Sequence, residues 1–217
     1  MPRALPPSRQ PHRAFRLDIG RLAVSCLHAE LTLQPKPGLV SPLDNGSHDD
    51  MSAATFMRSL FSLRHFFIQI CQAGIDDAPF AVLRQLGIAA EQRMLRATGG
   101  VNTHRGAIFS LGLLCAAAGR ARAQNIALSA PALRAILLIS WGDDLAAHTQ
   151  AMAPTTHGLQ VAARHATSGA REEGALGLPS VFEVGLPAML NTLKAGRSMR
   201  RARIDALFAL MAHISDT

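Results

Sequence analysis

The stretch GAIFSLGLLCAAAG, residues 106–119, is the longest uncharged apolar segment of the chain and indicates how the chain folds. A membrane-spanning helix needs about 18 consecutive apolar residues, and this segment is shorter and interrupted by glycines. We therefore expect a buried core helix from about Thr103 to Ala121, and no contact of the chain with a membrane.

Helical spacing of apolar residues continues on both sides of this segment. The clearest case is the range 51–72, where the residues expected to face inward are Phe56, Leu60, Leu63, Phe67 and Ile70. Alternation typical of strands is nowhere sustained. The predicted fold is all-α, a single bundle of about eight helices, with three polar glycine-rich loops forming the site. The helices are expected near residues 15–31, 51–72, 79–96, 103–121, 131–150, 156–167, 172–195 and 199–214, and the segment 172–195 is expected to be broken by Gly177, Pro179 and Pro187.

The composition favours one folded domain behind a short tail. Apolar residues make up 48% and charged residues 17% of the 217 residues, which excludes disorder for most of the chain. Residues 1–15, with four prolines and three arginines, are expected to be a flexible basic tail before a helical catalytic domain at 16–217. The three cysteines lie far apart, which excludes a disulfide framework and fits a cytoplasmic protein.

The net charge of +7 raises the question of nucleic-acid binding. Of the 22 basic residues 20 are arginines, and they are spread along the chain rather than gathered in one patch. One cluster, formed by Arg197, Arg200, Arg201 and Arg203, has helical spacing and is expected to be a solvated face. Nucleic acid is therefore not the expected partner, whereas a phosphate-rich small molecule suits the same positive field.

The first polar loop, residues 34–50, contains three prolines and two glycines and cannot be a regular helix. Lys36 lies between two prolines and before Gly38, an arrangement that suits phosphate binding. Three carboxylates and a histidine follow within seven residues, and carboxylates together with substrate phosphates are ligands that Mg²⁺ accepts. These residues are Asp44, His48, Asp49 and Asp50. An Asp-Asn-Gly turn followed by a helix cap is an equally weighted interpretation.

The other two loops also combine glycines with cations. In GGVNTHRG, residues 99–106, the glycines allow a close backbone approach, the following helix start favours an anion, and Arg105 adds a bidentate phosphate contact. The alternative is a pair of helix caps, and the spacing of a Walker A loop is missing. The third loop comprises THG, residues 156–158, and Gly169 to Glu173, in which Arg171 is as easily part of a surface ion pair.

The motifs PKPGLV, DNGSHDDM, TGGVNTHRGAIFSLGLL, THG, GAR-x-E and a closing DT occur in this order. Over roughly residues 20–217 the chain thereby resembles the triphosphoribosyl-dephospho-coenzyme A synthases. The resemblance implies an all-helical enzyme that joins ATP and 3′-dephospho-CoA and releases adenine. It also implies that the product passes to the transferase that loads the acyl carrier subunit of malonate decarboxylase or citrate lyase.

The resemblance also assigns roles to residues of the three motifs. The catalytic candidates are Asp44, His48, Asp49 and Asp50. The residues expected to bind the nucleotide are Lys36, Gly38, Asn102, Thr103, His104, Arg105, Gly106 and Arg171. A Mg²⁺ ion bound with ATP is expected on Asp49, Asp50 and Glu173.

The sequence departs from the family pattern in places. Ser41 and Ser47 stand where the family usually has Asp and Ala, and Glu172-Glu173-Gly174 replaces a Gly-Glu-Ala pattern. The family continues beyond the Asp-Thr pair at 216–217, so the chain is expected to be a shortened or truncated homologue that is inactive, or nearly so, and less stable than an extended form.

Two other functions remain as alternatives. One is a helical His-Asp metal phosphohydrolase with ligands drawn from His28, His48, Asp49 and either Asp143 or Asp144. The other is a non-enzymatic basic module that binds RNA or a carrier protein.

Overall fold

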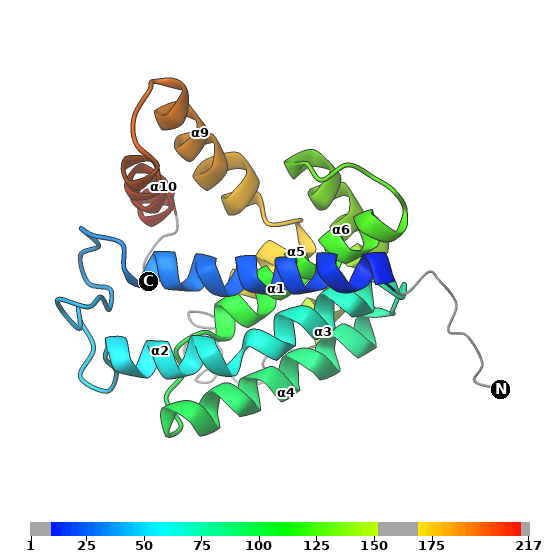
Figure 1. Cartoon of the computed structure of the whole chain (residues 1–217), viewed down its shortest axis with the longest axis horizontal. Coiled ribbons are helices and arrows are strands. Elements are labelled where there is room, and N and C mark those ends of the chain that lie inside the picture. The colour runs from blue at the N-terminus through cyan, green and yellow to red at the C-terminus, as the bar shows by residue number, and fades with distance from the viewer. Residues whose placement is uncertain (1–9, 152–168, 214–217) are drawn as a thin grey trace.

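The structure, a computed structural model, describes residues 10–151 and 169–213, and over these residues every regular element is a helix (Figure 1). The predicted all-α class is therefore confirmed. The elements are α1 (Gln10–Leu31), α2 (Ala53–Ser62), α3 (Arg64–Ile75), α4 (Phe80–Thr98), α5 (Arg105–Ala123), α6 (Ala130–Ala151), α8 (Gly169–Ala175), the π-helix η3 (Ser180–Gly185), α9 (Leu186–Lys194) and α10 (Met199–His213).

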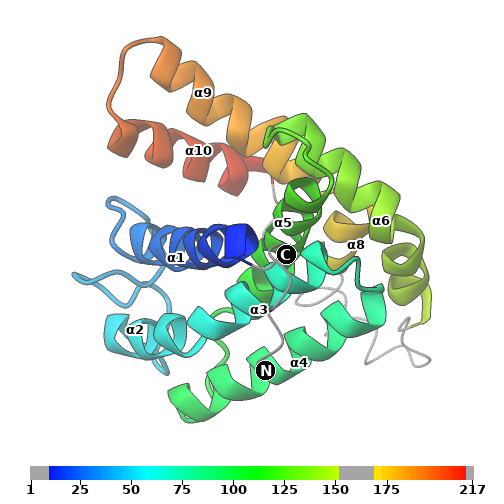
Figure 2. The same ribbon diagram turned by 45° about the vertical axis from the view of Figure 1, so that its right-hand side comes forward.

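The core helix expected from the opening apolar stretch is α5, and it packs most extensively against α3. Small residues permit this approach, because a Cβ atom on Gly74 would overlap the carbonyl of Ala116 and one on Gly119 would overlap that of Cys71. Helices α1, α4 and α6 surround this pair (Figure 2). Helices α4 and α8 also pack on α5, at whose start the second polar loop ends.

Some helix boundaries differ from those predicted. The expected helix at 51–72 is two helices, α2 and α3, because the buried Leu63 bonds back to Leu60 and Phe61 in a tight turn. Helix α1 includes residues from Gln10, which the sequence placed in the tail, and Arg122 lies over the ring of Phe15. The segment 172–195, which is expected to be interrupted, is divided into α8, η3 and α9, and Gly177 and Pro179 lie between α8 and η3. The expected helix at 156–167 lies outside the described residues.

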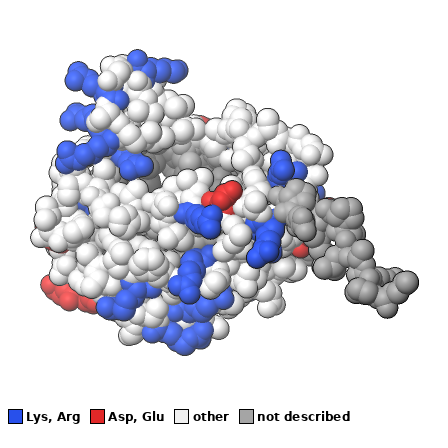
Figure 3. All heavy atoms as spheres, in the orientation of Figure 1, with Lys and Arg blue, Asp and Glu red and all other residues white. Residues whose placement is uncertain are grey.

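Helices α9 and α10 form a hairpin that packs on itself and on η3 (Figures 1 and 2). The predicted arginine cluster, Arg197 before α10 with Arg200, Arg201 and Arg203 on it, is exposed as expected, and basic residues gather over this corner of the surface (Figure 3). Arg200 donates to the carbonyl of Gln34 at 3.0 Å, and Arg201 pairs with Asp205 at 3.0 Å. Among the helices that the structure describes, none has the length and apolar character needed to cross a membrane.

Candidate functional site

The first loop folds back on itself and buries its cation. Lys36 Nζ donates to the Glu30 carboxylate at 2.7 Å and to the Glu30 carbonyl at 2.9 Å, and only 1% of the Lys36 side chain is exposed. The backbone of Gly46 lies so close to that of Gly38 that a Cβ there would overlap it, and both glycines have positive φ. The local fold therefore directs Lys36 to Glu30, away from solvent.

The carboxylates of the same loop lie outside. Asp44 Oδ1 accepts the Gly46 amide at 2.7 Å, which is the turn that the Asp-Asn-Gly sequence indicated. Asp49 and Asp50 are exposed, His48 is half-buried, and Ser52 rather than Asp50 caps α2. The loop thus presents acid–base groups at the surface and keeps its cation inside.

The second loop places the hydroxyl of Thr103 and the imidazole of His104 against Ser59 of α2. Thr103 Oγ1 donates to Ser59 Oγ at 2.6 Å, and Ser59 Oγ lies 2.6 Å from His104 Nδ1. Because Ser59 accepts from Thr103, its own proton is directed to Nδ1, and the neutral His104 ring then carries its proton on Nε2. His104 Nε2 is buried and has no partner among the described residues.

The surroundings of His104 keep the ring uncharged. Burial, and next the positive charge of Lys36, lower the pKa of His104 to about 4. The ring of Phe56 meets it edge-on with the ring centroids 5.0 Å apart, and the His104 amide donates to Met94 Sδ at 3.2 Å. At neutral pH His104 is therefore a hydrogen-bond donor through Nε2 and carries no charge.

A pocket of about 360 Å³ opens near these groups and is lined by residues of α3, α4, α5, α6 and α8. Its wall is largely apolar, with Phe66, Phe80, Leu83, Phe109 and Leu113 among the lining side chains. Three arginines join that wall from three helices: Arg84 from α4, Arg105 from α5 and Arg171 from α8. Apolar rings beside several guanidinium groups suit a ligand that combines a flat base with phosphates.

The start of α5 supplies the second motif to this pocket. Asn102 and Gly106 line it with Arg105, and Asn102 Oδ1 accepts the Arg105 amide at 3.2 Å. Arg105 Nε donates to Glu91 Oε1 at 2.7 Å, and a second guanidinium nitrogen contacts the same oxygen. The cation expected from the sequence therefore does line a pocket, where it is paired with a carboxylate from α4.

The third motif divides its residues between the pocket and the framework. Arg171 and Ala170 line the pocket, whereas Glu173 accepts the Ser180 amide at 3.1 Å and the Ser180 hydroxyl at 2.6 Å. Glu173 thus holds the start of η3 against α8. The THG motif lies outside the described residues.

The expected magnesium ligands are not gathered at one place. Over residues 10–151 and 169–213, no group of three or more His, Cys, Asp and Glu side chains is arranged to hold a metal ion. Asp49 and Asp50 are exposed, while Glu173 is bonded to Ser180. One or two carboxylates suffice for Mg²⁺ when substrate phosphates complete its shell, so the Asp49–Asp50 pair fits such an ion and Glu173 fits it poorly.

Several residues of the site were not predicted from the sequence. Ser59 lies in a helix 45 residues from the His104 that it bonds, whereas Glu30 lies in the last turn of a helix only six residues before Lys36 and belongs to no motif of its own. Arg84, Glu91 and His148 line the pocket but belong to no motif. For Arg84 and Glu91 a signal did exist, because positions 84, 87, 88 and 91 share one face of a helix.

Comparisons of the sequence with known proteins show the family of the chain. The sequence model of the family described as ATP:dephospho-CoA triphosphoribosyl transferase matches residues 16–217. A protein of Acinetobacter calcoaceticus, named a probable 2-(5″-triphosphoribosyl)-3′-dephosphocoenzyme-A synthase, is 41% identical over 204 residues, 94% of this chain and 69% of that protein. Its counterpart in Stutzerimonas stutzeri (strain A1501) is 41% identical, covering 99% of this chain and 73% of its own length.

A third relative carries the same name without the word probable. This synthase of Pectobacterium atrosepticum is 38% identical, covering 93% of this chain and 69% of its own length. No solved structure matches the chain. Together with the helical fold, these similarities define the chain as an enzyme of the transferase class. It belongs to the triphosphoribosyl-dephospho-coenzyme A synthase family, as its motifs indicated.

The phosphohydrolase alternative finds no support in the structure. Asp143 and Asp144 are exposed within α6, and His28 is exposed on α1. In the described part of the chain they form no metal-binding group with His48 and Asp49. The non-enzymatic alternative is excluded by the family.

Proposed function

We propose that the chain transfers the 5-triphosphoribosyl group of ATP to the 2′-hydroxyl of 3′-dephospho-CoA. The bond between the ribose C1′ and N9 of adenine breaks, and a bond from C1′ to the 2′-oxygen of dephospho-CoA forms. Adenine leaves with a proton, and the attacking hydroxyl loses one. The product is 2′-(5″-triphosphoribosyl)-3′-dephospho-CoA, with the triphosphate intact.

The observation that carries the proposal is the pocket at the start of α5. It joins the second motif, through Arg105, to the third, through Arg171, although 66 residues separate the two arginines in the sequence (171 − 105). The reaction requires a site that binds the triphosphate without cleaving it. Guanidinium groups meet that need, because they form charged hydrogen bonds with phosphate and do not act as nucleophiles.

The ribosyl transfer itself needs carboxylates. Displacement at an anomeric carbon passes through an oxocarbenium-like state, which a nearby carboxylate stabilises, and a base takes the proton of the attacking hydroxyl. We assign these roles to four groups of the first loop: the exposed Asp44, Asp49 and Asp50, and the half-buried His48. Asp49 and Asp50 would also hold a Mg²⁺ ion, which when bound neutralises charge on the triphosphate.

The names of the relatives support dephospho-CoA as the acceptor. A downstream enzyme would then attach the product to the acyl carrier subunit of malonate decarboxylase or citrate lyase. The proposal covers either malonate decarboxylase or citrate lyase as the enzyme that receives the product.

The reaction products test the proposal directly. The purified chain is incubated with ATP, with 3′-dephospho-CoA and with both, and the mixtures are separated by chromatography. We expect free adenine only when both substrates are present, together with a product that retains three phosphates. ADP and phosphate in place of adenine would overturn the proposed reaction.

A further inference from the structure

Helix α4 presents Arg84, a cation that belongs to no sequence motif, to the pocket. Arg84, Gly87, Ile88 and Glu91 all line the pocket, and their spacing places them on one face of α4. Arg84 is exposed, and over the described residues no hydrogen bond or ion pair engages its side chain. Within the described part of the chain its guanidinium is therefore not engaged by another protein group.

Two arginines of the pocket wall act on the same imidazole. His148 lines it from α6, and its pKa is lowered by burial and then by the charges of Arg171 and Arg84. Both guanidinium groups are thus close enough to influence one imidazole. Arg105 lines the same pocket from the start of α5.

One carboxylate opposes this charge. Glu91 is paired with Arg105, and the two side chains are 32% and 45% exposed, respectively. A pair this open to water is weak and exchanges its partner readily. A phosphate chain offers Arg105 several oxygens of higher charge than the single oxygen of Glu91 that it contacts.

We propose that Arg84, Arg105 and Arg171 together form a binding site for a linear polyphosphate, and that Glu91 is the protein's own anion, displaced from Arg105 when the polyphosphate binds. Arg84 takes the place that the sequence assigned to Lys36, whose ammonium is buried against Glu30. The apolar wall beside the arginines makes a nucleoside polyphosphate the natural ligand. Only its identification as ATP rests on the proposed function.

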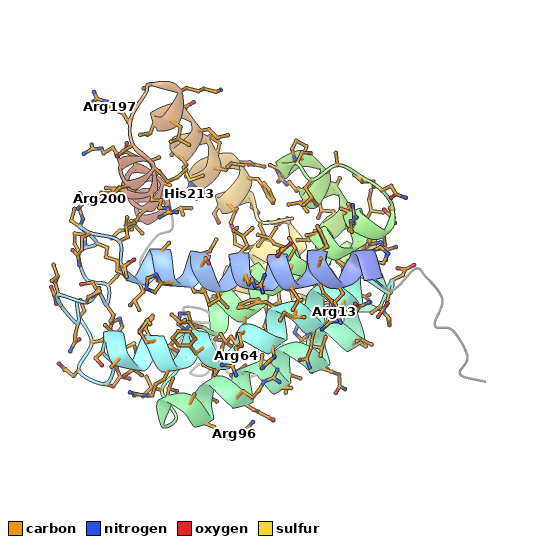
Figure 4. The ribbon with its side chains drawn as sticks, viewed as in Figure 1. Arg13, Arg64, Arg96, Arg197, Arg200 and His213 are labelled. Carbon is orange, nitrogen blue, oxygen red and sulfur yellow. The ribbon has the colours of Figure 1, made fainter. Side chains whose placement is uncertain are left out.

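The test uses inorganic tripolyphosphate as the probe, titrated calorimetrically into the full chain. Loss of one charged hydrogen-bonding group should weaken binding roughly tenfold or more in Arg84→Gln. Arg84→Lys should keep part of the affinity, because the charge remains. Arg96→Gln is the matched control, since Arg96 lies on the same helix, does not line the pocket and projects into solvent (Figure 4).

Removal of the competing anion should act in the opposite direction. Glu91→Gln should bind tripolyphosphate several-fold more tightly than the unmodified chain. Unchanged or weaker binding in Glu91→Gln would overturn its role as a displaced anion. Equal affinities of Arg84→Gln and Arg96→Gln would overturn the three-arginine site.

This experiment stands apart from the transfer reaction, because tripolyphosphate has no ribose. If the variants behave as expected but no adenine is released from ATP, the proposed reaction fails and the polyphosphate site stands. If adenine is released while Arg84→Gln binds as tightly as the control, the reaction stands and the site fails.

Discussion

The first and second polar loops treat their cations in opposite ways. Lys36 in the first loop is buried and bonded to Glu30, whereas Arg105 in the second lines an open pocket and is paired with an exchangeable carboxylate. The first loop instead exposes its acids, Asp49 and Asp50. The comparison teaches that a cation in a glycine-rich motif is not by itself a phosphate ligand. Its local hydrogen bonds decide whether it faces a ligand or stabilises the loop.

The largest effect that bears on this division concerns the acids of the first loop. Asp50→Asn should lower the turnover number by about 10²–10⁴, the usual contribution of a general acid or base. Asp50 is exposed and does not cap α2, so the circular dichroism and melting temperature should stay unchanged. Steady-state adenine release measures the effect, with the exposed Asp18→Asn on α1 as the control. Near-normal turnover would remove Asp50 from the catalytic groups.

The next effect is a pH dependence caused by His104. Its pKa is about 4 in the folded chain, below the ordinary value of 6.5, so the unfolded chain binds the proton more readily. The stabilising effect of the neutral ring is complete above pH 6.5 and is lost as the pH falls towards 4, by up to roughly 3 kcal/mol. Denaturant unfolding of the unmodified chain and of His104→Gln between pH 4 and 7 isolates this component. Parallel curves for the two proteins would contradict a buried neutral imidazole.

A smaller effect distinguishes the structural role of Lys36 from the ligand-binding role of Arg105. Lys36→Ala should lower the free energy of unfolding by about 1.5–3 kcal/mol, since a buried charged hydrogen-bonding group is lost. The affinity of the folded variant for ATP should stay within a few-fold of normal. Urea unfolding measures the change in stability, and calorimetry measures the affinity for ATP. A stable Lys36→Ala protein with strongly reduced ATP affinity would return Lys36 to the nucleotide site.

The smallest effect concerns the hydroxyls that orient His104. Ser59→Ala removes the donor to Nδ1 and should cost about 0.5–1.5 kcal/mol of stability. It should also allow the imidazole to populate both neutral tautomers, which nitrogen NMR of labelled histidine detects. The control is Ser62→Ala, because Ser62 lies one turn after Ser59 in α2 and its hydroxyl donates to the Ser59 carbonyl. A single Nε2-protonated tautomer in Ser59→Ala would show that Ser59 does not set it.

Local patterns predicted the fold class but not the assembly of the site. The period of apolar residues predicted α4 and α5 closely, because burial of one helix face leaves a direct trace in the sequence. The break at Leu63 left none, since no glycine or proline marks it. The bond between Ser59 and His104 joins residues 45 apart, and the pocket is lined from five helices, so neither assembly has a local signature.

The central claim is that the pocket at the start of α5 receives the triphosphate of ATP. A crystal structure of the full chain with ATP tests it most directly. We expect the triphosphate to contact Arg84, Arg105 and Arg171, with Arg105 released from Glu91 and Lys36 still bonded to Glu30. A triphosphate bound instead to Lys36 in the first loop, with the Arg105–Glu91 pair intact, would contradict the account.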